Sequence, residues 1–278
     1  MRRTAYKSRN INNRFRKAGR IVCNKISDIG GVMGIVATGG IGRKFSDEFS
    51  DLDFFVYADK SKARQIASYI AIGQLCYKNI QLDIPVLSYQ NAMRHKVPSN
   101  YWSQVVRWTL KYGEIWYDPG AKVKTLFDKK LIFPKNEQKL LLNRYHHRVD
   151  EILNYIYPAW EARGQIWNLA HLLRRAAENM ILWAYAKNKL FQPYLTKWFY
   201  FYFENNLIPE AIYFPKIRRA FTAPIENKRQ ADQLRERLFR LCYSFEMNIE
   251  KVSMADVIEK NTRNWEKASD KTKQFLSF

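Results

Sequence analysis

The sequence predicts an α+β protein, with a mixed β-sheet flanked by helices in its N-terminal part and an α-helical bundle in its C-terminal part. Short apolar runs bounded by turn residues, which are typical of strands, occur only in the first half. After Pro134 these runs disappear, and apolar residues recur at helical spacing instead. A length of 278 residues accommodates two modest domains. We therefore expect domains at residues 1–134 and 135–278.

The expected elements of the first domain alternate between helices and short strands. In chain order they are a helix over Asn13–Ile29, strands over Gly34–Ala37 and Asp53–Tyr57, a helix over Ser61–Gln74, a strand over Gln81–Tyr89, a helix over 102–108 and a strand over 112–117. In the second domain, helices are expected at about 136–157, 160–188, 194–206, 226–250 and 254–268. Most aromatic residues of this second half are expected to lie in the core.

The composition is that of a folded protein in a reducing compartment. Hydrophobic residues make up 47% of the chain and aromatic residues 15%, which predicts well-filled cores. The three cysteines are widely spaced and have no histidines at metal-ligand spacing, so no zinc site is expected. There is no run of eighteen apolar residues and no apolar signal segment, and we therefore expect a cytoplasmic protein without a membrane span.

The formal net charge of +21 is the most unusual global feature. Residues 1–21 contain eight Lys or Arg residues and no acidic residue. Such a segment is either a surface that binds a polyanion or a solvated basic arm, and the sequence leaves both interpretations open.

Two acidic residues, Asp51 and Asp53, stand at the start of the second expected strand with one apolar residue between them. Because alternate residues of a strand point to the same side, the two carboxylates should converge while Leu52 enters the core. Two like charges so close together favour a positive ion between them, and hard oxygen ligands suit Mg²⁺.

A pair of glycines, Gly39-Gly40, follows the first expected strand. A turn without β-carbons lets backbone N–H groups approach an anion such as a phosphate, although Gly-Gly can also be only a turn. A phosphate-binding turn beside a carboxylate pair that holds Mg²⁺ is the apparatus of nucleotidyl transfer.

Together these features resemble the DNA polymerase β-like nucleotidyltransferase superfamily. Its signature is Gly-Gly or Gly-Ser after an apolar residue, a spacer of about nine to thirteen residues, and an acidic-apolar-acidic triplet. Here the spacer is Ile41–Ser50. The branch that looks most similar contains the adenylyltransferases that act on aminoglycoside and lincosamide antibiotics. The residues that match its pattern without a gap are Gly39, Arg43, Asp47, Glu48, Ser50, Asp51 and Asp53. The chain departs from it at Gly40, where the branch prefers Ser, and at Lys44, where it has Gly.

The resemblance implies roles for further residues. Asp83, the one acid on the strand Gln81–Tyr89, would be the third metal ligand, the base for the attacking hydroxyl, or both; alternatively it is an edge-strand acid paired with a lysine. The triphosphate would be held by Gly39, Gly40, Arg43, Ser50 and Lys197. Lys197 lies in the segment Pro193-Tyr-Leu-Thr-Lys197-Trp198, which resembles a Pro-x-x-Lys-Trp element of this branch, and it could instead simply extend beside Trp198. Glu178 is a second candidate for the base, facing the acceptor.

The resemblance also implies the reaction. A nucleoside monophosphate, AMP from ATP in the first place, would pass to a hydroxyl group with release of pyrophosphate, in a cleft between the domains and with one or two Mg²⁺ ions. The acceptor would be a small molecule such as an antibiotic. Because small basic antibiotics favour an acidic cleft, the charge of +21 keeps two alternatives open: a nucleotidyltransferase that acts on tRNA or another RNA, and an inactive relative that binds nucleic acid.

Overall fold

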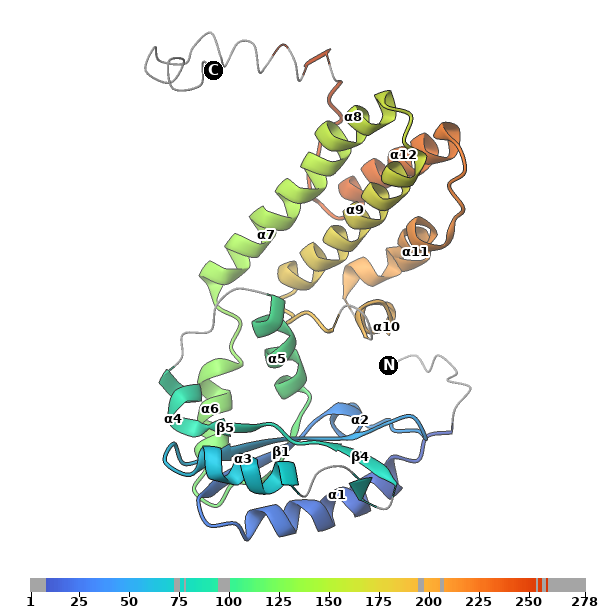
Figure 1. Cartoon of the computed structure of the whole chain (residues 1–278). Coiled ribbons are helices and arrows are strands. Elements are labelled where there is room, and N and C mark those ends of the chain that lie inside the picture. Colours follow the sequence, from blue (N-terminus) through green and yellow to red (C-terminus); the bar gives the residue numbers. More distant parts are fainter. Residues whose placement is uncertain are drawn as a thin grey trace, which may run out of the picture. The chain divides into compact units, whose positions relative to one another are not determined.

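The computed structural model describes residues 9–72, 76–77, 79–94, 101–194, 198–205, 208–253, 255–256 and 259 (Figure 1). The contacts within the chain divide it into two compact units. The sheet unit comprises the chain up to Pro134 together with Leu190–Phe199, and the helical unit comprises Lys135–Lys189 and the chain from Tyr200 onward. The membership of Leu190–Phe199 in the sheet unit was not predicted.

The structure confirms the α+β fold class. Six strands form one mixed sheet, β1 (Val32–Ala37), β2 (Leu52–Ala58), β3 (Cys76–Tyr77), β4 (Ile80–Asp83), β5 (Val86–Ser88) and β6 (Glu114–Tyr117). Their order is β3-β4-β2-β1-β6, and β5 also pairs with β2. The pairs β1–β2, β1–β6 and β3–β4 are antiparallel, whereas β4 and β5 run parallel to β2.

Helices cover both faces of the sheet (Figure 1). On one face, α1 (Asn12–Ser27) and α3 (Ala63–Ile72) pack on alternate residues of the central strands, such as Ile35 and Val56. On the other face, α4 (Tyr89–Arg94) and α6 (Lys122–Lys130) pack on the intervening residues, such as Val36. The period-two alternation of the strands thus gives the sheet two apolar faces. The short α2 (Gly39–Gly42) and α5 (Tyr101–Lys111) complete the elements of this unit.

The helical unit consists of α7 (Lys135–Asp150), a π-helical turn η1 (Glu151–Ile156), α8 (Tyr157–Ala162), α9 (Ile166–Lys187), α10 (Phe199–Asn205), a 3₁₀ turn η2 (Pro209–Tyr213), α11 (Phe214–Thr222) and α12 (Lys228–Ser244). Helix α10 begins at the last residue of the sheet unit. The longest helix, α9, buries the apolar stripe that its sequence predicts, including Leu169, Leu173 and Met180. None of the helices in the described ranges is both long and apolar enough to cross a membrane.

Several details differ from the sequence-based expectations. The strand expected over Gln81–Tyr89 is interrupted at Pro85, because proline has no N–H group to donate to a sheet. The helix expected over 160–188 is broken at Gly164, whose φ of 69° lies in the left-handed region. Helices α6 and α11 were not predicted. Trp167 is an exception to the expectation that most aromatic residues of the second half lie in the core, because it is 85% exposed. Most of the helix expected at 254–268 lies outside the described residues.

Candidate active site

Asp51 and Asp53 stand where the sequence places them, at the beginning of β2. Both are half-buried, and Leu52 between them is fully buried in the core of the sheet unit. Burial is the largest cause, and the negative charge of Asp51 the second largest, of a pKa of the Asp53 carboxyl well above its ordinary value. The sheet therefore brings two carboxylates together in a place where water compensates their charge poorly.

Asp83 lies beside this pair. Strand β4 runs parallel to β2, and Asp83, its last residue, is the register partner of Asp53. The charge of Asp83 contributes to the raised pKa of Asp53, whereas the charge of Arg43 opposes it. Asp83 is exposed, unlike Asp53. The three predicted acidic residues thus lie together where β2 begins and β4 ends, and we call this place the acidic end of the sheet.

The two glycines form the start of α2, a single helical turn between β1 and the loop that leads to β2. The turn is fixed to β2 because the backbone N–H of Thr38 donates to the carbonyl oxygen of Asp53 at 2.9 Å. Within the turn, the N–H groups of Arg43 and Phe45 donate to the carbonyl oxygens of Gly39 and Gly40. These bonds hold the glycines over the acidic end of the sheet.

Glycine is required at both positions for reasons of space. Gly39 has a φ of 54°, and a β-carbon on it would overlap Oδ2 of Asp53. A β-carbon on Gly40 would lie 2.5 Å from Oγ of Ser46 and 2.7 Å from the carbonyl oxygen of Phe45. The sequence suggested that these glycines let a phosphate approach the backbone, and the structure adds that Gly39 makes room for a carboxylate.

Arg43 connects the acidic residues to a distant part of the chain. Its charge acts on Asp53, and its guanidinium carbon lies 4.0 Å from the centre of the Trp198 ring. Trp198 belongs to the segment Leu190–Phe199 of the sheet unit. Sequence reasoning singled out Lys197 in this segment, but it did not identify Trp198 as the partner of Arg43. Lys197 itself lies outside the described residues.

The remaining predicted site residues make local contacts. The hydroxyl of Ser50 donates to Oδ1 of Asp47 at 2.9 Å and accepts the N–H of Asp47 at 3.0 Å, so it closes the turn before Asp51. Glu178 lies on α9 of the helical unit, where it forms an ion pair with Arg175 at 2.6 Å and accepts the hydroxyl of Tyr200 at 3.0 Å. This contact, after burial, contributes to a raised pKa of Tyr200.

Two carboxylates at the acidic end, those of Asp51 and Asp53, are suitable ligands for a magnesium ion. Two carboxylates on one strand are the ligands that Mg²⁺ commonly takes from a protein, with phosphate oxygens and water completing its shell. Over the described ranges, no group of three His, Cys, Asp or Glu side chains is gathered closely enough to hold a metal ion. The structure therefore fits a two-carboxylate site, and Asp83 as a third ligand stays a prediction.

No protein-family model matches the sequence, and no curated protein matches it significantly. Among solved structures, the chain is similar to that of a nucleotidyltransferase-like protein from Exiguobacterium sibiricum 255-15, at 10% sequence identity and a TM-score of 0.47. The match covers 82% of this chain and 74% of the other. A likeness of this degree does not establish a shared function.

Proposed function

We propose that the protein is a metal-dependent nucleotidyltransferase whose active site is the acidic end of β2 and β4. The observation that carries this proposal is the placement of Gly39 directly against the carboxylate of Asp53, with Asp51 and Asp83 beside it. Two half-buried acids beneath a glycine turn are costly for folding alone, and such arrangements are typical of functional sites.

The chain's own residues would act as follows. Asp51 and Asp53 would hold Mg²⁺, and Gly39, Gly40, Arg43, Ser50 and Lys197 would hold the triphosphate. When bound, the metal would stabilise negative charge on the attacking and leaving oxygens. Asp83, which is exposed, would take the proton of the acceptor hydroxyl, with Glu178 as the second candidate for this role.

The proposed nucleotidyl transfer needs only the nucleoside triphosphate and the acceptor hydroxyl as reactants. The acceptor oxygen forms a bond to the α-phosphorus of the nucleoside triphosphate, ATP in the first place, while the bond from that phosphorus to the bridging oxygen breaks. Pyrophosphate leaves, and the hydroxyl proton passes to the base. We propose that residues 1–134 catalyse this transfer and that residues 135–278 bind the acceptor.

Two classes of acceptor remain candidates. A small hydroxyl-bearing molecule such as an aminoglycoside or a lincosamide is the class that the resemblance in sequence favours. RNA is the second, and one specific observation supports it: a pocket of the sheet unit beside the α2 turn is lined by Arg9, Arg14, Arg16 and Lys44. An array of cations suits a polyphosphate backbone and disfavours a cationic antibiotic.

The test is transfer of label from each α-labelled nucleoside triphosphate in the presence of Mg²⁺. One reaction contains mixed aminoglycosides and lincosamides, another contains total tRNA, and each is run with wild type, Asp51→Asn and Asp128→Asn. Asp128 is an exposed acid on α6 that forms an ion pair with Lys124, and it serves as the matched control.

We expect labelled product with wild type and with Asp128→Asn, but not with Asp51→Asn. Label in the antibiotic reaction or in the tRNA reaction identifies the acceptor class. Equal labelling by Asp51→Asn would show that the acidic end of β2 is not the catalytic centre. Absence of label from every acceptor, with intact binding of the triphosphate, would favour the inactive relative.

A further inference from the structure

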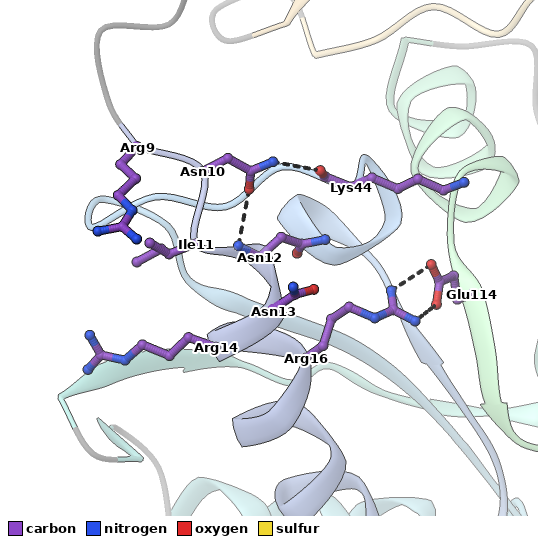
Figure 2. A pocket seen from close by; sticks show the side chains of 9 residues that line it. All are labelled: Arg9, Asn10, Ile11, Asn12, Asn13, Arg14, Arg16, Lys44 and Glu114. Atoms are coloured by element: carbon purple, nitrogen blue, oxygen red, sulfur yellow. Dashed lines mark hydrogen bonds and ion pairs between the residues drawn. The ribbon is translucent and has the colours of Figure 1, made fainter.

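A pocket of the sheet unit lies beside the α2 turn and outside the proposed catalytic machinery (Figure 2). It has a volume of about 730 Å³ and is bounded by the residues before α1, the first turn of α1, the loop after α2 and the start of β6. A pocket of this size has room for more than one phosphate group. Its lining is almost entirely polar, with Ile11 as its one apolar side chain.

The charge of the pocket is strongly positive. Arg9, Arg14, Arg16 and Lys44 contribute cations, and Glu114 contributes the one acid. Glu114 is committed to Arg16, because both of its oxygens accept guanidinium N–H groups at 2.8 Å (Figure 2). Arg9, Arg14 and Lys44 are exposed, and none of the three forms an ion pair with a described residue.

The segment that carries these cations is held to the α2 loop and is not a free arm. The N–H of Ile11 donates to the carbonyl oxygen of Ser46 at 2.7 Å, and the buried hydroxyl of Ser46 donates to Oδ1 of Asn12 at 3.0 Å. The side-chain amide of Asn10 donates to the carbonyl oxygen of Lys44 at 3.3 Å. The sequence left open whether the basic N-terminal segment is a solvated arm, and from residue 9 onward these contacts place it on the surface of the sheet unit.

Lys44 occupies a backbone position that glycine would favour. Its φ of 59° lies in the left-handed region, where a β-carbon is unfavourable. The side chain is exposed, so it contributes little to packing. The exposed charge of Lys44 is thus presented by a backbone position that a glycine would occupy with less strain.

An exposed aromatic ring follows in the same loop. Phe49 is 86% exposed, and it is presented by the turn in which Asp47 accepts the N–H groups of Phe49 and Ser50. Exposed aromatic rings, combined with basic grooves, are the means by which proteins stack and bind unpaired bases.

The pocket lies at the same end of the sheet as the acidic residues. Glu114, at its edge, is the register partner of Ala37, which on its other side pairs with Phe54, the residue after Asp53. Lys44 directly follows Arg43. Strand pairing thus connects the edge of the pocket, at Glu114, to the strand that carries Asp53.

We propose that this pocket binds the phosphate backbone of single-stranded nucleic acid, with Arg9, Arg14 and Lys44 contacting phosphates and Phe49 stacking on a base. The residues that line the pocket do not include Asp51, Asp53 or Asp83. The proposed binding of nucleic acid therefore does not depend on whether the protein catalyses nucleotidyl transfer. If the proposed nucleotidyl transfer is correct, the bound strand is its acceptor.

The experiment is fluorescence anisotropy of short labelled single-stranded RNA and DNA with the full chain over a range of salt concentrations. The variant combines Arg9→Gln, Arg14→Gln and Lys44→Gln. The matched control removes three exposed charges elsewhere on the sheet unit, by Arg64→Gln, Lys122→Gln and Lys129→Gln. The pocket variant should bind on the order of 100-fold more weakly, and the slope of log affinity against log salt should fall by about 2. Equal weakening in the control would overturn the proposal, because it would show binding by overall charge.

Two single variants separate binding from folding. Lys44→Gly should keep or raise the melting temperature because it relieves the backbone, yet it should weaken binding. Phe49→Ala should weaken single-strand binding about 5- to 100-fold, with less effect on duplex. Unchanged affinity in both would contradict the proposal.

Two further measurements test whether the pocket binds a nucleic-acid backbone or a free nucleotide, and whether strand binding and nucleotidyl transfer are independent. If inorganic pyrophosphate or ATP displaces the bound strand stoichiometrically from the pocket, the pocket is a site for a nucleotide and not for a nucleic-acid backbone. This result would overturn the inference. Asp51→Asn should bind the strand as wild type does. Strand binding without label transfer would then contradict the catalytic proposal alone, and label transfer to a small molecule without strand binding would contradict this inference alone.

Discussion

Gly39 lies so close to Asp53 that a β-carbon on the glycine would occupy the place of a carboxylate oxygen. The two residues come from different elements, the α2 turn and β2, and the bond from the N–H of Thr38 to the carbonyl oxygen of Asp53 fixes their separation. A glycine that follows a buried strand thus determines where an acidic side chain can point. This relationship couples the glycine turn to the chemistry of the carboxylates.

Replacing Gly39 with alanine should abolish nucleotidyl transfer and lower stability by about 1–2 kcal/mol, because alanine is strained at positive φ and would displace Asp53. The control is Gly164→Ala. Gly164 also has a positive φ, 69°, but nothing lies within 4 Å of its β-carbon position, so only the backbone strain is shared. Thermal denaturation should show both variants destabilised, and transfer assays should show only Gly39→Ala inactive. Full activity of Gly39→Ala would contradict the role of this contact.

Arg43→Gln should raise the KM for the nucleoside triphosphate about tenfold or more, because a charge proposed to contact the triphosphate is lost. A second arginine provides the control, since Arg20 lies over Trp116 at the same distance of 4.0 Å that separates Arg43 from Trp198. If the contribution of Arg43 is its packing on an aromatic ring, Arg20→Gln and Arg43→Gln should affect KM alike. We expect Arg20→Gln to leave it unchanged, as measured by steady-state kinetics.

The ion pair between Arg16 and Glu114 should make stability depend on acidic pH. The hydrogen bond from Arg16, followed by that from Trp116 and the charges of Arg16 and Arg20, lowers the pKa of Glu114 below 4.5. A carboxyl with a lowered pKa stabilises the folded state above its unfolded pKa, and this contribution is lost as pH falls through the folded pKa. The free energy of unfolding of wild type should therefore decline more steeply below pH 4.5 than that of Glu114→Gln, by about 1 kcal/mol.

Urea denaturation at a series of pH values measures this difference. Asp128→Asn removes an acid from the more exposed pair with Lys124 and should leave the pH profile close to that of wild type. Parallel profiles for wild type and Glu114→Gln would show that the ion pair contributes no stability.

Arg235 should be essential to the stability of the helical unit. Its buried guanidinium donates twice to the carbonyl oxygen of Leu153, at 2.9 and 2.7 Å, within the π-helical turn η1. Arg235→Met would leave that carbonyl without this donor, at a cost of about 2 kcal/mol. Arg237→Met, an exposed change on the same helix, should cost less than about 0.5 kcal/mol. Urea denaturation that gives equal shifts for the two variants would refute this role.

The sequence predicted the centre of the sheet unit well because its signals are local. The apolar alternation of β1 and β2, the Gly39-Gly40 break and the spacing of Asp51 and Asp53 all lie within the single segment Val32–Ala58. The register of Asp83 against Asp53 and the contact of Arg43 with Trp198 depend on pairing between remote segments. No local pattern encodes such pairing.

The misplaced helices have identifiable physical causes. Helix α6 was missed because its first N–H groups are accepted by Asp118, four residues before the helix begins, and not by an N-cap side chain. The break between α8 and α9 depends on the backbone of one residue, Gly164, inside a pattern that otherwise continues as a helix.

The central claim is that Asp51 and Asp53 share a divalent metal ion. The most direct measurement is anomalous diffraction from crystals of the protein with Mn²⁺ and a non-hydrolysable nucleoside triphosphate. We expect an anomalous peak about 2.1 Å from a carboxylate oxygen of each residue, and we expect this peak to disappear in Asp51→Asn. A peak that persists in the variant, or wild-type crystals that bind the nucleotide with no metal at these carboxylates, would contradict it.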